Sequence, residues 1–319
     1  MIIVTGGAGF IGSNIIKGLN ERGYEDILIV DDLKDGNKSR NMNALKFSDF
    51  IDKNDFINSL EYFRNSDIDA FFHQGACTDT MENDGRYMLK NNYEYSKDLL
   101  HFAMEGKIPF IYASSASVYG QGEKGFEEKR ENENPLNVYA FSKFLFDQYV
   151  RKYLKEAKSQ IVGLRYFNVY GQQENHKKRM SSPVLKFYNQ LKENKKAKVF
   201  EGSEDFLRDF VYVDDVVDVN LFFYKNSEKN GIFNCGTGQP KSFIKVAKKL
   251  IDLLSYGEIE NIPFPEKLKG KYQDFTKAEL TKLRNAGYKK EFKTLEKGIE
   301  LYFNYLEKNE GFLYLKENQ

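Results

Sequence analysis

A glycine-rich turn near the beginning of the chain restricts the possible folds more than any other segment. It follows residues 2–4, a short β-branched apolar run that is typical of a buried strand. A helix-like stretch, residues 13–19, comes directly after it. Between them, Gly7, Gly9 and Gly12 have the spacing Gly-x-Gly-x-x-Gly, which lets a backbone approach a pyrophosphate at a helix N-terminus. An ordinary strand–helix turn would need only one glycine, so we expect a dinucleotide-binding unit here.

The second predicted strand, residues 27–30, ends in the acidic pair Asp31 and Asp32. An acidic residue at this distance from a glycine-rich turn usually accepts hydrogen bonds from the adenosine ribose, which favours NAD. Lys34 and Lys38 follow closely and could instead hold the 2′-phosphate of NADP. These residues by themselves leave NAD and NADP both open.

Strand-like and helix-like segments alternate through the first half of the chain. Further strands are expected within residues 69–76, 107–115 and 160–166. Because helices connect parallel strands, this alternation predicts an α/β fold with a doubly wound parallel sheet of the Rossmann type. Ligands of such sheets bind outside the carboxyl ends of the strands. The residues expected at that edge are Gly75, Ala76, Ser114, Ser115, Phe167 and Asn168.

The second half of the chain is less regular and suggests a smaller domain. After a basic segment the pattern recovers, with strands expected at 209–213 and 231–234 and helices at 214–223, 242–254 and 295–306. We interpret residues 1–168 as a domain that binds the nicotinamide cofactor and that the chain rejoins at about 209–235. Residues 169–208 and 236–319 are then expected to form a smaller, interleaved α/β substrate-binding domain.

Tyr139 and Lys143 form the most suggestive pair of chemical groups in the chain. Four residues apart in a helix-like segment, they would lie on one face, one turn apart. There the ammonium can stabilise the phenolate and lower the tyrosine pKa from about 10 towards the working pH. Such a tyrosine can exchange a proton with a substrate hydroxyl as that hydroxyl becomes a carbonyl. The alternative is an ordinary solvated helix face.

Charge and composition argue against several kinds of partner. The chain has 48 lysine and arginine residues against 47 acidic residues. This near balance of charge does not favour nucleic acid or a membrane surface as a binding partner. The apolar runs are too short to cross a bilayer, and the immediate strand leaves no room for a signal peptide. Two isolated cysteines and three scattered histidines indicate a reducing compartment and no metal site. We expect a cytoplasmic protein.

Four motifs together resemble the extended short-chain dehydrogenase/reductase superfamily, whose members act on nucleotide-diphosphate sugars. They are Gly6-x-x-Gly9-x-x-Gly12, residues 114–120 (Ser-Ser-Ala-Ser-Val-Tyr-Gly), Tyr139-x-x-x-Lys143 and residues 165–171 (Arg-Tyr-Phe-Asn-Val-Tyr-Gly). More narrowly, the chain resembles the ADP-heptose 6-epimerase family along nearly its whole length. The specific segments are residues 31–36, 73–77, 137–139, 200–203 and 267–273.

This resemblance implies a redox-neutral epimerisation at C6″ of an ADP-heptose, in the supply of heptose for lipopolysaccharide cores. A tightly bound NADP⁺, one per subunit, would oxidise the sugar to a 6″-ketone and reduce it again on the other face. The family's preference for NADP favours cofactor contacts from Lys38 and Lys53, with NAD left open. The resemblance also implies a homo-oligomer, for which the family tends towards a pentamer.

The resemblance implies four catalytic residues: Tyr139, Lys143, Ser115 and Lys177. Lys177 would be the second acid/base, its pKa lowered by desolvation and by the neighbouring Lys178 and Arg179. The alternative for Lys177 is a basic loop that faces solvent or a pyrophosphate. Ser115 would hydrogen-bond the reacting oxygen, unless it only shapes a turn.

The remaining implied contacts divide between cofactor and substrate. The cofactor residues would be Gly6, Gly9, Phe10, Ile11, Gly12, Asp31, Asp32, Lys38, Lys53, Gln74, Gly75, Ala76, Cys77, Thr78, Asn91, Lys143, Val169 and Lys177. The substrate residues would be Asn168, Arg179, Lys186, Phe200, Glu201, Gly202, Ser203, Arg208 and Tyr272. At Arg179 and Lys186 the chain departs from the family pattern, in which a small residue and a histidine occur.

Two other functions stay open at this point. A UDP-hexose 4-epimerase would share the glycine-rich turn, Ser115, Tyr139 and Lys143, and would differ from about residue 167 onwards. A non-catalytic NADP-binding sensor would keep the glycines, but such proteins tend to lose the tyrosine and lysine. A 4,6-dehydratase is disfavoured, because Ala116 and Ser117 stand where that chemistry places adjacent acidic residues.

Overall fold

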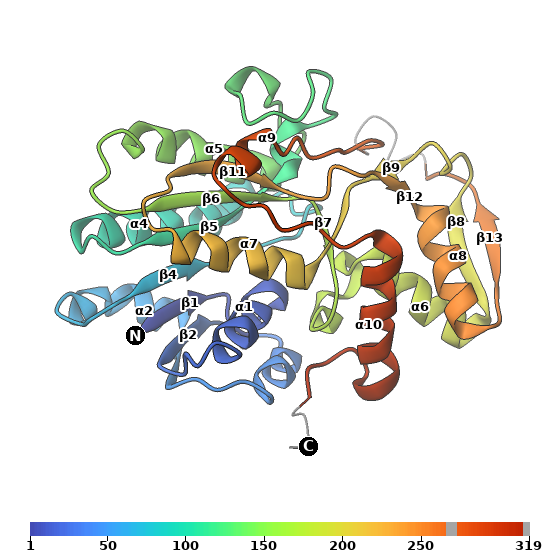
Figure 1. Cartoon of the computed structure of the whole chain (residues 1–319), viewed down its shortest axis with the longest axis horizontal. Helices are drawn as coiled ribbons and strands as arrows, with labels where there is room; N and C mark the ends of the chain where they lie inside the picture. The colour runs from blue at the N-terminus through green and yellow to red at the C-terminus, as the bar shows by residue number, and fades with distance from the viewer. Residues whose placement is uncertain (266–272, 315–319) are drawn as a thin grey trace.

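The predicted parallel sheet is present in the computed structural model, which describes residues 1–265 and 273–314 and gives the sheet seven strands (Figure 1). Their order is β11-β6-β5-β4-β1-β2-β3, and all neighbours pair in parallel. The strands are β1 Ile2–Thr5, β2 Ile27–Asp31, β3 Asp49–Asp52, β4 Ala70–His73, β5 Phe110–Ser115, β6 Ile161–Tyr166 and β11 Gly231–Cys235. The strand order reverses between β1 and β4, where open α/β sheets bind ligands at their carboxyl edge. The predicted α/β doubly wound fold is confirmed.

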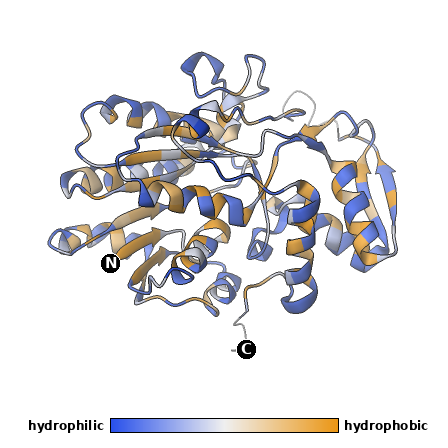
Figure 2. Ribbon diagram, in the orientation of Figure 1, coloured by the Kyte–Doolittle hydropathy of each residue, from blue (hydrophilic) through white to orange (hydrophobic). Residues whose placement is uncertain are grey.

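Helices cover both faces of this sheet, because alternate side chains of each strand point to opposite sides. On β1, Ile2 and Val4 pack in one core with α1 and α7, whereas Ile3 packs in another with α4 and α5. The helices around the sheet are α1 Phe10–Asn20, α2 Lys53–Asn58, α3 Gly85–Leu89, α4 Tyr95–Glu105, α5 Val138–Tyr153, α7 Val213–Lys225 and α9 Thr281–Asn285. Figure 2 shows the apolar residues concentrated in the central strands and on the helix sides that face them.

A second hydrophobic core lies beside the sheet, to the right in Figure 1. It is built by α6 Pro183–Asn194, α8 Phe243–Leu254, α10 Leu295–Asn309 and the parallel pair β8 Lys196–Phe200 and β13 Glu258–Ile262. Two further pairs are β7 Asn168–Tyr170 with β10 Phe210–Tyr212, and β9 Leu207–Arg208 with β12 Lys241–Ser242. The expected division into two domains stays a prediction. In the described part of the chain, no helix is both long and apolar enough to cross a membrane.

Candidate active site

The glycine-rich turn packs tightly against the segment that follows β4. Gly6 has a φ of +69°, and a Cβ on it would lie 2.6 Å from the nitrogen of Gly75. A Cβ on Gly12 would lie 2.1 Å from the carbonyl oxygen of Gly6, so a larger residue would push α1 away from the turn. Among the described residues, no side chain caps the N-terminus of α1 at Gly9. The free amides of that first turn fit a cofactor pyrophosphate.

A chain of buried hydrogen bonds fixes the carboxyl ends of β1 and β4. The amide of Gly75 donates to Thr5 Oγ1 (3.3 Å), which lies 2.6 Å from Nδ1 of His73. The other ring nitrogen lies 2.8 Å from the hydroxyl oxygen of Ser96, which itself donates to the carbonyl of Asn92. These partners place the His73 proton on Nε2, and burial lowers the pKa of His73 to about 3. A neutral histidine therefore holds the backbone on which the cofactor segment begins.

The segment from Gln74 to Thr78, predicted to contact cofactor, is held by a residue that the sequence analysis did not identify. Asn92 accepts a hydrogen bond from the amide of Cys77 (2.8 Å) and donates to its carbonyl (2.9 Å). It lies in a π-helical turn, Lys90–Glu94, a feature that often marks functional sites. Nε2 of Gln74 is buried and has no partner within the described residues, so this segment offers a donor to a bound molecule.

Two acidic and two basic side chains meet at the end of β2. Lys38 Nζ lies 2.5 Å from the Asp31 carboxylate, and Lys53 Nζ lies 2.9 Å from that of Asp32. The other oxygen of Asp31 accepts a hydrogen bond from the amide of Ala8 at 2.9 Å. These groups line a cavity of about 360 Å³. Of the predicted cofactor residues, that cavity contains Gly6, Asp31, Asp32, Lys38, Lys53, Gly75, Ala76, Cys77 and Asn91.

Ser115, Tyr139 and Lys143 come together where β5 ends against α5. Asn137 caps α5 through a hydrogen bond to the amide three residues later, which begins the helix just before Tyr139. The Tyr139 side chain hydrogen-bonds Ser115. The Lys143 ammonium instead donates to the carbonyl of Ala113 at 2.9 Å. The expected lowering of the tyrosine pKa is therefore wrong in this structure: burial raises the pKa of Tyr139, and only the Ser115 hydrogen bond opposes it.

The Lys143 side chain is itself perturbed. It is buried, and burial lowers its pKa to about 8, against the attraction of Asp147 one turn further along α5. The Asp147 carboxylate accepts hydrogen bonds from Tyr112, Ser114 and Arg165, each at 2.9 Å. One turn beyond Lys143, α5 thus contributes Asp147 to a buried charge network.

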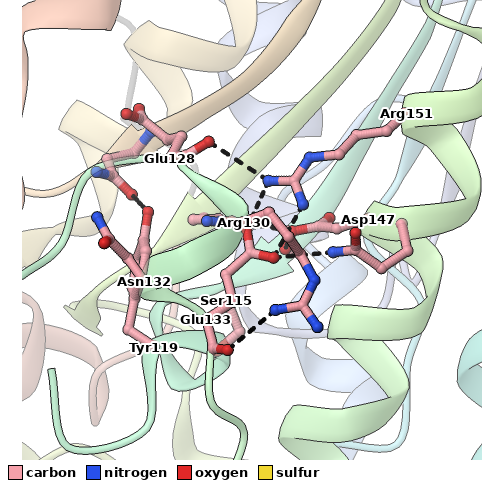
Figure 3. A network of polar contacts seen from close by, with 12 residues as sticks. Ser115, Tyr119, Glu128, Arg130, Asn132, Glu133, Asp147 and Arg151 are labelled. Atoms are coloured by element: carbon pink, nitrogen blue, oxygen red, sulfur yellow. Dashed lines mark hydrogen bonds and ion pairs between the residues drawn. The ribbon is translucent and has the colours of Figure 1, made fainter. Parts of the chain in front are cut away.

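Figure 3 shows this network, which the sequence analysis did not predict. The Arg165 guanidinium is fully buried and forms ion pairs with both Asp147 and Glu133. Glu133 also accepts from Arg151 of α5 at 2.5 and 2.9 Å. The ring of Tyr119 lies 4.8 Å from the Arg165 guanidinium carbon. These contacts join β6, α5 and the loop between β5 and α5, and Ser114 ties the end of β5 to them through Asp147.

Lys177 lies in a 3₁₀ turn, η6 Asn175–Met180, which we call the Lys177 loop. Its ammonium is 5.3 Å from the ring centre of Phe10, the first residue of α1, so the loop and the glycine-rich turn are neighbours. Burial lowers the pKa of Lys177, as expected, and the nearby Glu174 opposes the shift. A lysine in this position can exchange protons nearer to neutral pH.

The neighbouring cations do not cause this shift, contrary to expectation. Lys178 is paired with Asp35 at 3.0 Å, and Arg179 is paired with Asp79. Both side chains are largely exposed, so their charges are compensated at the surface. The structure therefore attributes the lowered pKa of Lys177 to its burial.

The predicted substrate residues are distributed over several elements. Asn168 and the cofactor candidate Val169 lie on β7, and Lys186 is an exposed residue of α6. Arg208 is buried on β9, with its guanidinium 5.6 Å from the ring centre of Phe243. The candidates at the end of β8 are Phe200, the exposed Glu201 and Gly202, and the buried Ser203. Tyr272 lies outside the described residues.

Comparisons with known proteins agree with this architecture. Residues 2–236 match the NAD dependent epimerase/dehydratase family. Over 319 residues the chain is 58% identical to an ADP-L-glycero-D-manno-heptose-6-epimerase from Brachyspira hyodysenteriae, covering 98% of this chain and 100% of that one. The fold is similar to the ADP-L-glycero-D-manno-heptose-6-epimerase of Helicobacter pylori, with a TM-score of 0.84 and 31% identity over 96% of each chain. It is also similar to the UDP-glucose 4-epimerase of Thermotoga maritima, with a TM-score of 0.81 and 28% identity, over 96% of this chain and 98% of that one.

Proposed function

This chain belongs to the NAD dependent epimerase/dehydratase family, and we propose on that basis that it converts ADP-D-glycero-D-manno-heptose to ADP-L-glycero-D-manno-heptose. The reaction inverts C6″ through a transient 6″-ketone, without net oxidation, and supplies a precursor of the lipopolysaccharide core. The observation that carries the proposal is the 58% identity, over 98% of this chain, with the Brachyspira hyodysenteriae relative of that name.

The contacts of Ser115, Tyr139 and Lys143 support a role for them in the proton transfer of this reaction. The Tyr139 phenolate, held by Ser115, would accept the proton of the C6″ hydroxyl as that carbon becomes a ketone. Lys143 would stabilise the phenolate. For this, its ammonium has to leave the carbonyl oxygen of Ala113 and donate its hydrogen bond to the Tyr139 oxygen instead. The nicotinamide cofactor of the family, when bound, supplies the hydride exchange at this carbon.

Lys177 is our candidate for the second acid/base. Inversion requires proton transfer to the substrate oxygen in two orientations, which a single tyrosine cannot serve from one position. The Lys177 ammonium lies close to Phe10 at the start of α1, on the glycine-turn side of the site, and its lowered pKa suits general acid–base chemistry. Tyr139 and Lys177 would thus act from different elements on the same oxygen.

We infer that the cofactor is NADP rather than NAD. In an NAD complex, the Asp31 carboxylate would accept hydrogen bonds from the ribose hydroxyls. Here it already forms an ion pair with Lys38 and accepts a hydrogen bond from the amide of Ala8. Lys38 and Lys53 lie at this end of β2, each paired with a carboxylate, and a 2′-phosphate would replace those carboxylates as their partner. The glycine-rich turn and Nε2 of Gln74, a donor with no partner among the described residues, support binding of the rest of the dinucleotide.

The function is tested by following the C6″ proton of ADP-D-glycero-D-manno-heptose by NMR in the presence of the purified protein. We expect interconversion of the two epimers without added oxidant or reductant. UDP-glucose is the competing substrate, because the fold is also similar to a UDP-glucose 4-epimerase. Inversion of UDP-glucose at C4, with no change at C6″ of the heptose, would contradict the proposal.

A further inference from the structure

Three consecutive polar residues, Gln172, Gln173 and Glu174, are completely buried just before the Lys177 loop. Nε2 of Gln172 donates to Oδ1 of Asn14 (2.8 Å) in α1, and Nε2 of Gln173 donates to the carbonyl of Asn41 (2.7 Å) in η1, Gly36–Met42. Hydrogen-bonded buried polar groups specify one arrangement of the backbone, because an unpaired group there is costly. This segment therefore fixes where the Lys177 loop begins relative to α1.

Glu174 also fixes where the loop ends. Its two carboxylate oxygens accept hydrogen bonds from the amide and the hydroxyl of Ser182, both at 2.6 Å. Ser182 is the N-cap of α6, directly after the loop. The carbonyl of Glu174 accepts a hydrogen bond from the amide of Lys177 at 2.9 Å. One residue thus contacts both the helix beyond the loop and the backbone of Lys177 within it.

The backbone of the loop needs such an anchor. Lys178 has a φ of +48° with a ψ of −117°, and Gln173 has a φ of +75°. Residues with a side chain rarely adopt these conformations, and they persist where surrounding contacts enforce them. Loss of the contact between Glu174 and Ser182 would therefore let the loop relax and move Lys177.

We propose that Glu174 is a positioning residue for Lys177. It anchors the Lys177 loop to α6, and it places a buried negative charge close to the Lys177 ammonium. The proposal rests on the proposed function in that Lys177 is taken as the second acid/base. Burial raises the pKa of Glu174, and Lys177 together with the Ser182 hydrogen bonds opposes that rise. The other titratable groups that face this pair are His176 of the loop, Lys186 of α6 and Tyr302 of α10.

The variant Glu174→Gln removes the charge while keeping the shape and one acceptor oxygen. We expect the pKa of the Lys177 amine to fall by about one unit, because the charge of Glu174 raises that pKa and a nearby opposite charge favours the charged form by this order. The pKa is measured by NMR after ¹³C reductive methylation, and the Lys177 signal is the one absent from Lys177→Arg. Ser182→Ala is the matched control: it loses the hydroxyl donor but keeps the backbone hydrogen bond to Glu174 and both charges, so the loop stays anchored and the Lys177 pKa should stay unchanged within a few tenths of a unit.

An unchanged Lys177 pKa in Glu174→Gln overturns the proposal, and so does an equal fall in Ser182→Ala. If Glu174→Gln does not fold, the reciprocal measurement decides, because coupling between two sites is the same in both directions. Lys177→Gln must then raise the pKa of a buried carboxyl in ¹³C-glutamate-labelled protein. If the pKa of no buried carboxyl rises, the proposal is overturned. These measurements need no heptose, so failure of the proposed function would appear only in the C6″ assay.

Discussion

The ammonium of Lys143 donates a hydrogen bond to the carbonyl oxygen of Ala113, 2.9 Å away. Ala113 lies on β5 two residues before Ser115, and Lys143 lies on α5 one turn after Tyr139. The lysine therefore holds the strand that carries the serine against the helix that carries the tyrosine. A residue whose expected role is electrostatic also contributes to the geometry of the site.

Replacement of Lys143 by methionine should change how the stability of the protein depends on pH. Burial lowers the pKa of Lys143 to about 8, below the value of 10.5 for an exposed lysine. Between these values the unfolded chain binds more protons at this residue than the folded one, so Lys143 makes the free energy of unfolding rise with pH. The full rise is about 3 kcal/mol, and Lys143→Met should lack it. Urea unfolding of both proteins at several pH values across this window measures the difference.

Lys34→Met is the control for that experiment, because Lys34 is exposed and its loss should leave the pH dependence of unfolding intact. Parallel curves for the wild type and Lys143→Met would contradict the lowered pKa of Lys143.

Tyr139→Phe should reduce the turnover of ADP-heptose by about a hundredfold to ten-thousandfold, the usual contribution of a general acid–base group. The substitution removes only the hydroxyl that contacts Ser115, so the fold should be retained. Tyr62→Phe is the matched control, because Tyr62 is 87% exposed and does not line the cofactor cavity. Turnover is followed at C6″ by NMR, and full activity in Tyr139→Phe would disprove the proposed role.

The central sheet and the tyrosine–lysine pair were predictable because their determinants are local. An apolar run such as residues 2–4 can hardly be anything but a buried strand, and a four-residue spacing on a helix defines a shared face. By contrast, β3 was not predicted, because its sequence Asp-Phe-Ile-Asp has an acidic residue at each end. In the structure this strand is only half buried.

The ion pairs of the buried charge network could not be predicted, because the residues that form them are distant from one another in the sequence. Arg165 meets Glu133 and Asp147 only through the folding of β6 against α5. In the same way, helical spacing brings Lys143 close to Tyr139 but does not reveal the competing carbonyl of Ala113. Spacing therefore predicted that Tyr139 and Lys143 lie one turn apart on a helix, whereas their pKa values depend on burial and on acceptors that only the structure provides.

Asp147→Asn should destabilise the protein strongly. The substitution removes one of the two carboxylates that pair with the buried Arg165 guanidinium (Figure 3), and it weakens the acceptor for Tyr112 and Ser114. Breaking a buried ion pair by removing one partner costs about 3–5 kcal/mol. Urea unfolding measures the change, with Glu105→Gln as the control, because its pair with Arg64 is exposed and contributes little. A midpoint for Asp147→Asn equal to that of the control would show that the network does not stabilise the fold.

Lys38→Ala should shift the cofactor preference from NADP towards NAD. The variant loses a cation proposed to bind the 2′-phosphate, and a hydrogen bond to a charged group contributes about 1.5–3 kcal/mol, or at least tenfold in affinity. It also removes the ion pair that occupies the Asp31 carboxylate, which frees that carboxylate to accept the ribose hydroxyls of NAD. Calorimetric titration of both nucleotides measures the two affinities, and Lys46→Ala, an exposed lysine that does not line the cavity, is the control. Equal losses of affinity for NADP and NAD in Lys38→Ala would show that Lys38 does not distinguish the two cofactors.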